Sequence, residues 1–454
     1  MSVANASHSP QGQVAKTLGG WRGSLEAGEL PLFRAFVEHT LPRLRGPFLA
    51  QHSPAKVLAH LETAFRFTQK RAPGTIKCEL QPCDKGVQIL TNMVDQPFIV
   101  DTLRLFLRNN KADYLGGFNL VFKAERDANG ALTGVGEGTT ESVVFLEAER
   151  GEVDFDKDPP HILMRLQTAE ATVRDFRAMT RHVERYVEKL ETEADRRPDL
   201  ASACRETGAF LTWLLRENFV FMGLSDHEAL GIQRLSGRYC TQPEGDWPKA
   251  HDSGFVRVRK SALESPIHRS GRIDEILVTL GDDAETEPLY ICGLFTYRAV
   301  TQPSRNVPIL RRVLANILAA SENTPGSYRH NGMANVFDSL PTEFLFTAEE
   351  REIVEIIERV LESEVQQDAR VQIVQSGHDD VTFALAAMPK DRWNDQLRES
   401  MQDVLRRTTG ATYSDHGVFV GRFDTMLVHF YLTGSRRLGD SELEALTEQL
   451  VELA

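Results

Sequence analysis

Two stretches of the chain show similar successions of strand-like and helix-like patterns, and this similarity constrains the fold more than any other feature of the sequence. In the first stretch, residues 75–150, alternation over 87–91 predicts a strand. Apolar residues at helical spacing over 99–107 predict a helix, and the apolar runs 121–122 and 143–145 predict two more strands. The order strand, helix, strand, strand is typical of a βαβ sandwich.

The second stretch covers about residues 366–435 and shows this order after one additional strand pattern. It contains strand patterns at 371–373 and 381–385, a helical pattern at 391–407, and strand patterns at 418–420 and 426–432. The tripeptides Val87-Gln-Ile89 and Val371-Gln-Ile373 are alike at what we take as the first strand of each stretch, although three residues are too few to prove a repeat. The shared architecture predicts two ferredoxin-like sandwiches.

Helical and mixed patterns fill the rest of the chain and predict an α+β, multi-domain fold. Short strand-like pieces between helical patterns, at 219–221, 255–258, 275–278 and 290–295, predict a mixed α/β domain in the middle. The charged helical pattern at 169–194 indicates a connector with one buried face, with a partner-binding helix as the alternative. We expect a disordered leader (1–20) and helical lead-in at 1–74, a first sandwich at 75–165, a linker helix at 166–200, the middle domain at 201–346, and a second sandwich with flanking helices at 347–454.

Capping residues predict where three of the helices begin. In Asp95-Gln-Pro97 the aspartate can cap a helix and the proline suits its first turn. Thr347 with Glu350, and Ser441 with Glu444, each predict a capping box. The last helix reaches the final residue without a Gly, a Pro or a polar tail, which favours a cut through a longer polypeptide over a natural terminus.

Charge and cysteine content make several classes of protein unlikely candidates for this chain. The 454 residues carry a formal net charge of −13, and acidic proteins repel phosphate backbones, so we expect no nucleic-acid partner. No apolar run approaches the ~20 residues that a membrane span needs, so we expect no membrane association. The five cysteines are few and odd in number, which fits a reducing cytoplasm and not a disulfide scaffold.

No group of residues has the spacing of a catalytic, cofactor or metal site. The glycines at 134–138 lack the spacing of a dinucleotide-binding turn, and Cys78 and Cys83 have no second pair to complete a zinc site. His378 lies in a predicted hairpin turn and His429 in a predicted strand, where turn geometry and packing explain them more simply. We therefore predict no catalytic, cofactor-binding or metal-binding residue.

Short motifs follow one another in a specific order over residues 75–435. They are Asp95–Asp101 (DQPFIVD), Arg216–Gly223 (RENFVFMG), Lys260–Arg269 (KSALESPIHR), Gly293–Thr296 (GLFT), Val307–Arg312 (VPILRR) and Asn335–Phe346 (NVFDSLPTEFLF). Each motif is weak alone, but together and in this order they are fairly specific. The chain resembles the N-terminal region of the large bacterial NAD-dependent glutamate dehydrogenases.

The resemblance implies a regulatory segment in which two ACT domains flank a PAS-like domain, and the alternative for this middle domain at 201–346 is a further ACT-like fold. In such enzymes the catalytic domain, which uses NAD, lies much further toward the C-terminus, so no cofactor is expected in this chain. ACT domains often bind amino acids in the loop between the first strand and the first helix. This implies a ligand site at Asn92, Asp95, Pro97 and Phe98, although the same residues also fit a plain loop and helix cap. Phe98 stands where a glycine is usual, and its ring would crowd such a pocket.

Two hypotheses of function follow. In the first, the chain is the non-catalytic regulatory and assembly segment of the dehydrogenase, a cytoplasmic homo-oligomer, and contacts its own catalytic region and the other subunits. The whole enzyme would convert L-glutamate and NAD to 2-oxoglutarate and ammonia. In the second, the chain is a free-standing ACT/PAS sensor that binds an amino-acid effector. An enzyme with an unfamiliar site is a more remote third reading.

Overall fold

The computed structural model describes all residues except 1–8, 236–246, 248, 252–253, 281–287, 376–379 and 422–423. The chain divides into two compact units. Unit 1 contains the residues up to Arg174 together with Ser265–Ser270, and unit 2 contains Asp175–Glu264 and Gly271–Ala454. Within the described residues, no helix is both long enough and apolar enough to cross a membrane.

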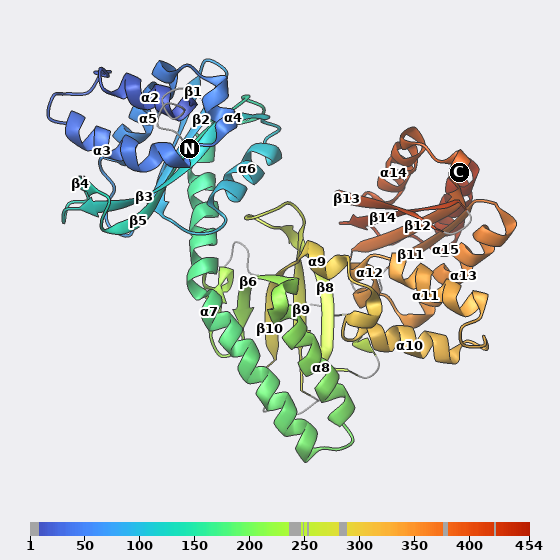
Figure 1. Ribbon diagram of the computed structural model, residues 1–454. Helices are drawn as coiled ribbons and strands as arrows, with labels where there is room; N and C mark the ends of the chain where they lie inside the picture. Colours follow the sequence, from blue (N-terminus) through green and yellow to red (C-terminus); the bar gives the residue numbers. More distant parts are fainter. Residues whose placement is uncertain are drawn as a thin grey trace. The chain divides into compact units, whose positions relative to one another are not determined.

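Unit 1 is built on one antiparallel sheet in the strand order β1-β2-β5-β3-β4 (Figure 1). The strands are β1 (Lys77–Cys83), β2 (Gly86–Val94), β3 (Tyr114–Arg126), β4 (Leu132–Val135) and β5 (Thr139–Ala148). Helix α6 (Ile99–Asn109) connects β2 to β3, and β5 lies between these two strands and pairs with both. This is the split βαβ arrangement, and it contains the strand, helix, strand, strand order that the sequence predicts for residues 75–150.

Helices cover both faces of this sheet because its strands alternate apolar side chains to each side. Val144 and Leu146 of β5 pack on α6 and on the first turns of α7 (Asp158–Arg196). Val143 and Phe145 pack on the helices that precede the sheet, where Phe36 meets Phe122 edge to face. These helices are α2 (Pro10–Leu18), α3 (Leu30–Thr40), the short 3₁₀ turn Leu41–Arg43, α4 (Gly46–Gln51) and α5 (Pro54–Thr68).

The lead-in differs from the sequence prediction in two ways. Pro10–Leu18, expected in a disordered leader, is a helix: Ser9 accepts the Gly12 N–H through its side chain, and Val14 and Leu18 are buried. The lead-in is also not a separate appendage, because its apolar side chains and those of the sheet form one core. Periodicity shows that a helix has an apolar face but does not show what that face packs against.

Unit 2 contains a second antiparallel sheet in the order β7-β6-β10-β9-β8. Its strands are β6 (Phe219–Ser225), β7 (Ala229–Gly231), β8 (Val256–Glu264), β9 (Arg272–Val278) and β10 (Leu289–Phe295). Four of them coincide with predicted strands, and β7 is too short to show a pattern. The accompanying helical segments are α8 (Ala201–Trp213), the π turn Leu214–Asn218, the 3₁₀ turns Ile232–Leu235 and Ser304–Asn306, α9 (Tyr297–Val300), α10 (Leu310–Ala320), α11 (Tyr328–Ser339) and α12 (Thr342–Thr347).

The C-terminal sheet of unit 2 has the order β11-β12-β14-β13, which corresponds to β1-β2-β5-β3 of unit 1. Its elements are α13 (Glu350–Gln366), β11 (Arg370–Gln375), β12 (Val381–Pro389), the 3₁₀ turn Lys390–Arg392, α14 (Asp395–Thr409), β13 (Tyr413–Val420), β14 (Thr425–Thr433) and α15 (Asp440–Leu453). One face packs on α14 and α15, and the other packs on α12 and α13. Strands β11 and β12 pair as the predicted hairpin, while His378 of its turn lies outside the described residues.

The tripeptide likeness between the two stretches is a wrong alignment. Val87–Ile89 lies in β2, the second strand of its hairpin, whereas Val371–Ile373 lies in β11, the first strand. The strand equivalent to β11 is β1, which the sequence analysis missed. Strand β1 has no fully buried residue, and it therefore lacks the apolar alternation by which strands are recognised.

The two predicted capping boxes are each displaced by two residues. Helix α13 begins after Glu349, whose N–H donates to Glu352 at 2.8 Å, and not after Thr347. Helix α15 begins after Gly439, whose N–H donates to Glu442 at 3.0 Å, and not after Ser441. In both cases a glutamate at the third helical position provides the acceptor. Neighbouring acidic residues make several caps plausible from sequence alone.

Candidate functional site

The four residues predicted to bind a ligand lie at the end of β2 and in the connection from β2 to α6. Asn92 is fully buried and, by alternation with Leu90, faces the helices that precede the sheet. Asp95 and Pro97 follow the strand, and Phe98 immediately precedes α6. The side-chain amide of Asn92 belongs to a polar network in the sheet. Asp95, Pro97 and Phe98 lie in the connection and are not part of this network.

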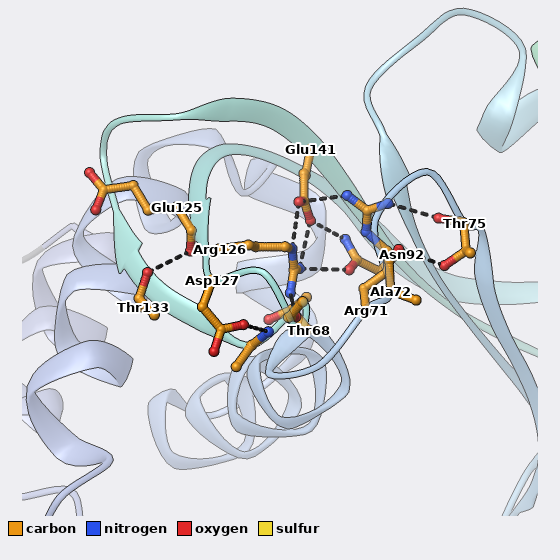
Figure 2. A network of polar contacts seen from close by, with 12 residues as sticks. Thr68, Arg71, Ala72, Thr75, Asn92, Glu125, Arg126, Asp127, Thr133 and Glu141 are labelled. Carbon is orange, nitrogen blue, oxygen red and sulfur yellow. Dashed lines mark hydrogen bonds and ion pairs between the residues drawn. The ribbon is translucent and has the colours of Figure 1, made fainter.

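The network surrounds the carboxylate of Glu141 on β5, which is completely buried (Figure 2). Arg126 at the end of β3 donates from Nε to Oε1 at 2.7 Å and from Nη2 to Oε2 at 2.8 Å, a bidentate pair. Arg71 donates from Nη2 to Oε1 at 2.7 Å, and Asn92 donates from Nδ2 to Oε2 at 3.0 Å. The Asn92 oxygen in turn accepts from Arg126 Nη2 at 3.1 Å.

The two arginines also fasten the surrounding backbone. Arg126 Nη1 donates to the carbonyl of Gly130 at 2.8 Å, and the backbone N–H of Arg71 donates to the same carbonyl at 3.0 Å. Arg71 Nη1 donates to the carbonyl of Thr75 at 2.7 Å. The network therefore connects the chain before β1 with β2, β3 and β5, segments that are far apart in the sequence.

The network holds Glu141 as a charged, fully occupied acceptor. Burial raises the pKa of this carboxyl, but hydrogen bonds from Arg126, Arg71 and Asn92 outweigh burial and hold the pKa below its usual range. Both oxygens accept two hydrogen bonds each. A carboxylate in this state is a poor proton acceptor at neutral pH, so the chemistry of the network is structural clamping.

Phe98 occupies a left-handed backbone conformation, with φ of 73°, directly before α6. This conformation is unfavourable for any residue with a Cβ, which explains why the resemblance leads one to expect glycine here. The ring of Phe98 packs against His268, also a unit 1 residue, with ring centroids 5.1 Å apart. The phenyl ring therefore has a packing role against His268.

Asp95 and Pro97 do not act as the predicted helix start. Helix α6 begins at Ile99, so Pro97 lies outside its first turn, and no side chain caps it. The backbone N–H of Asp95 donates to the carbonyl of Thr140 at 3.0 Å, which continues the sheet. Burial raises the pKa of the Asp95 carboxyl, and Arg43 partly opposes this effect. A ligand role for Asn92, Asp95, Pro97 and Phe98 stays a prediction.

Several motif residues in unit 2 have structural tasks. Gly293 lies at a bulge of β10, where a Cβ would approach the carbonyl oxygen of Val220 to 2.0 Å, so only glycine fits. Lys260 forms an ion pair with the buried Asp274 at 2.6 Å. Phe344 stacks on Phe383 of the C-terminal sheet with centroids 3.9 Å apart. These contacts give the three motif residues structural roles in packing and charge pairing.

Glu141, Arg71 and Arg126 were not predicted as functional residues, although the sequence contains one signal for Glu141. Glu141 lies in the same alternating register as Val143 and Phe145, so a strand prediction already places a carboxylate on a buried face. A charge at such a position requires partners. Which arginines supply them depends on long-range pairing that no local pattern reveals.

Comparison with protein families identifies three segments of the chain. The model of the glutamate dehydrogenase ACT1 domain matches residues 36–156, and that of the ACT2 domain matches residues 370–454. The model of glutamate dehydrogenase helical motif 1 matches residues 307–365, which span α10 to α13. The ACT1 match begins within α3, so it includes most of the helices that share a core with the sheet.

Three curated relatives are named NAD-specific glutamate dehydrogenase. The NAD-specific glutamate dehydrogenase of Halomonas elongata is 25% identical over 395 residues, which cover 79% of this chain and 24% of that protein. The enzyme of the same name from Pseudomonas aeruginosa is 22% identical, over 74% of this chain and 23% of the relative. That from Mycobacterium tuberculosis is 22% identical, over 73% and 21%. The aligned part is less than a quarter of each relative's length.

Proposed function

The chain belongs to the glutamate dehydrogenase family through its ACT1, helical motif 1 and ACT2 segments, and we propose that it is the non-catalytic regulatory and assembly segment of an NAD-specific glutamate dehydrogenase. The whole enzyme oxidises L-glutamate to 2-oxoglutarate and ammonia with NAD. In this proposal NAD and glutamate bind in a catalytic region that these three segments do not include. The segment works in the cytoplasm.

The succession of the three segments in one chain carries this proposal. The relatives are more than four times longer than their aligned parts, which leaves ample polypeptide for a catalytic region. The buried carboxylate of Glu141 supports the non-catalytic role. Its two oxygens already accept hydrogen bonds from Arg71, Arg126 and Asn92, which leaves no free position for a substrate.

The PAS-like character of the middle sheet is part of the proposal. Support comes from its five antiparallel strands, in which the first and the last along the chain, β6 and β10, are neighbours inside the sheet. Helices α8 and α10 contribute to the same apolar core as β6 and β10. A sheet of this kind presents a packed face to its neighbours and suits a linker that passes conformational change along the chain.

Strand β13 of ACT2 supports the assembly role. It is the last strand of its sheet, and Val418, Phe419 and Val420 are exposed, the last at 67%. An apolar, unpaired strand edge invites pairing with another strand, and proteins ordinarily protect such edges. We propose that another subunit of the homo-oligomer covers β13, because isologous pairing of one edge with its own copy closes without leaving a new edge.

The first test measures whether the chain assists or performs catalysis. The purified 454-residue chain is assayed for NAD reduction with L-glutamate, alone and together with the glutamate dehydrogenase catalytic region of the same organism. We expect no turnover by the chain alone and a stable complex of larger native mass in the mixture. Turnover by the chain alone would refute the non-catalytic role, and an unchanged native mass would refute the assembly role.

A second test addresses the proposed edge. We expect Val420→Lys to lower the native mass of the assembly measured by light scattering, because a charge at an unpaired edge opposes pairing. Val365→Lys, at an exposed valine of α13, is the matched control and should leave the mass unchanged. Calorimetry of the same samples against the twenty amino acids tests an effector; uniform silence would leave assembly as the whole role.

A further inference from the structure

Two histidines and a glutamate approach one another on the same face of the unit 1 sheet as Glu141. His52 directly follows α4, His60 lies on α5, and Glu147 lies near the end of β5. One ligand atom from each residue lies within 4.8 Å of those of the other two, and all three residues are half-buried. The match to the ACT1 domain model gives no role to these three residues.

The ring of His52 is oriented by the backbone. Its Nδ1 lies 2.9 Å from the carbonyl oxygen of Phe48. A carbonyl oxygen only accepts hydrogen bonds, so Nδ1 must carry the proton and Nε2 must carry the lone pair. A histidine that binds a metal ordinarily donates its other ring N–H to a carboxylate or carbonyl in this manner.

His60 offers a nitrogen that the described structure leaves without a partner. Its Nε2 is buried and forms no hydrogen bond within the described residues. The ring is enclosed by Phe145, at 4.8 Å between ring centroids, and by His52, at 5.3 Å. A buried ring nitrogen without a hydrogen-bond partner is the kind of polar group that a bound metal ion satisfies.

Glu147 supplies an oxygen from strand β5 of the sheet. By alternation along β5 it projects to the same face as Phe145, the ring that borders His60. Its cross-strand neighbour on β3 is Gly116, where an added Cβ would meet no atom within 4 Å. The carboxylate therefore has room beside it on the sheet.

We propose that His52, His60 and Glu147 bind one divalent transition-metal ion, with zinc as the foremost candidate. Two imidazoles and one carboxylate are a recognised zinc ligand set, with a fourth position open to water. Tetrahedral coordination needs ligand atoms about 3.3 Å apart, which follows from bonds of about 2.0–2.1 Å, so the cluster closes by modest side-chain rotation. Magnesium and calcium prefer all-oxygen sites and are poor candidates.

Bound metal would connect α5 and the end of α4 to β5. A metal that binds the folded but not the unfolded chain raises the thermal stability of the fold. The positive charges of Lys56 and Lys85, which act on His60, weaken the site relative to a closed four-ligand zinc site. Partial exposure of all three residues leaves a path by which the ion enters and leaves.

The test uses the untagged 454-residue chain, freed of metal by a chelator. Calorimetric titration with zinc should show one saturable site, and cobalt should give the visible absorption of a four-coordinate ion at the same stoichiometry. Glu147→Gln and His52→Ala should each weaken zinc binding at least tenfold and abolish the zinc-dependent rise in Tm. Should His52→Ala fail to fold, Glu147→Gln alone decides, because it keeps the size and shape of the side chain.

Matched controls exist close by. His39 on α3 is exposed and has the same Nδ1 contact to a carbonyl four residues earlier, Ala35 at 2.9 Å, but lies outside the cluster. Glu149 is an exposed carboxylate two residues beyond Glu147. His39→Ala and Glu149→Gln should change zinc affinity by less than twofold. No saturable binding by the folded chain, or equal affinity in the cluster variants and these controls, would overturn the proposal.

Discussion

The ACT1 and ACT2 segments share their strand order but differ in what they bury on one face of the sheet. In ACT1 the face toward the preceding helices contains the charged Glu141 network beside a phenylalanine-rich core. In ACT2 the face toward α12 and α13 is apolar and aromatic, with Phe383, Leu385 and Leu427. The same topology can therefore bury either a network of charged groups or an apolar, aromatic cluster. It depends on the alternation of buried and exposed positions and not on particular side chains.

Strand register makes this difference specific. Val94 pairs with Glu141 at the end of β2, and Pro389 pairs with Thr425 at the end of β12. Counting back from these ends, Asn92 of ACT1 corresponds to Ala387 of ACT2. The carboxylate and the amide of one sheet are therefore replaced by a hydroxyl and a methyl group in the other. ACT2 keeps its fold without the clamp, so the clamp is specific to the ACT1 chain segments that it joins.

The largest expected difference between the two segments concerns Glu141. Glu141→Ala leaves Arg71 and Arg126 buried without their counter-charge, and we expect unit 1 to lose about 3–5 kcal/mol of unfolding free energy. The equivalent change in ACT2, Thr425→Ala, removes a buried hydroxyl and a methyl group but no charge, and should alter stability by about 2 kcal/mol or less. Urea unfolding monitored by hydrogen exchange separates the two units. Equal losses in both segments would contradict the comparison.

Acid should also act on ACT1 through Glu141. The folded-state pKa of this carboxyl lies below its unfolded value, so its stabilisation is present above the unfolded pKa and is lost as the pH falls through the folded pKa. We expect the unfolding free energy of unit 1 to fall below about pH 4, and this fall to be smaller in Glu141→Gln, where only other carboxyls with a lowered pKa, such as Glu62, contribute. Unfolding curves at a series of pH values measure it.

His429 gives ACT2 a pH dependence at higher pH. Its ring lies between Phe383 and Phe419, with centroids 5.8 and 5.6 Å away, and burial lowers its pKa to about 4. The unfolded chain binds this proton more readily, so stability falls as the pH drops from 6.5 toward 4. His429→Phe should remove on the order of 1 kcal/mol of that pH dependence in unit 2. An unchanged pH profile would show that the ring is accessible to protons when folded.

The smallest expected difference concerns the starts of the equivalent helices α6 and α14. Asn394 caps α14 by accepting the Leu397 N–H at 2.8 Å, whereas no side chain caps α6. Asn394→Ala should therefore destabilise unit 2 by about 1 kcal/mol. Asp95→Asn in ACT1 should leave stability within about 0.5 kcal/mol, because it changes no cap. A large loss on Asp95→Asn would instead indicate that Asp95 has a role of its own, as a ligand site requires.

Local patterns predicted the elements with buried faces and failed where structure depends on partners distant in sequence. The alternation at Val87 and Ile89 and the helical spacing at Leu103 and Phe106 lead to β2 and α6, because each has one apolar side. The half-exposed β1 has no such side and was missed. Nothing local to Arg71 indicates that it meets Glu141, seventy positions away in the chain.

The candidate sites follow the same rule. A strand register places Glu141 and Glu147 on one buried face with Phe145, and this much is readable from sequence. The histidines that approach Glu147 come from α5 and from the residue after α4, and only the packing of these helices on the sheet brings them there. The ACT1 loop resemblance directed attention to Phe98, whereas the polar chemistry lies on the strands.

The hydrogen bonds from Arg71 and Arg126 to the Gly130 carbonyl determine where the boundary of this domain can lie. They fasten the end of the N-terminal helices to the β3–β4 turn, and the same helices shield the phenylalanines of the sheet. A protein trimmed to begin at β1 would expose these phenylalanines to water. It would also leave the buried carboxylate of Glu141 without Arg71. Helices and sheet must therefore be gained, lost or transplanted as one piece, whatever boundary a linear reading of the chain suggests.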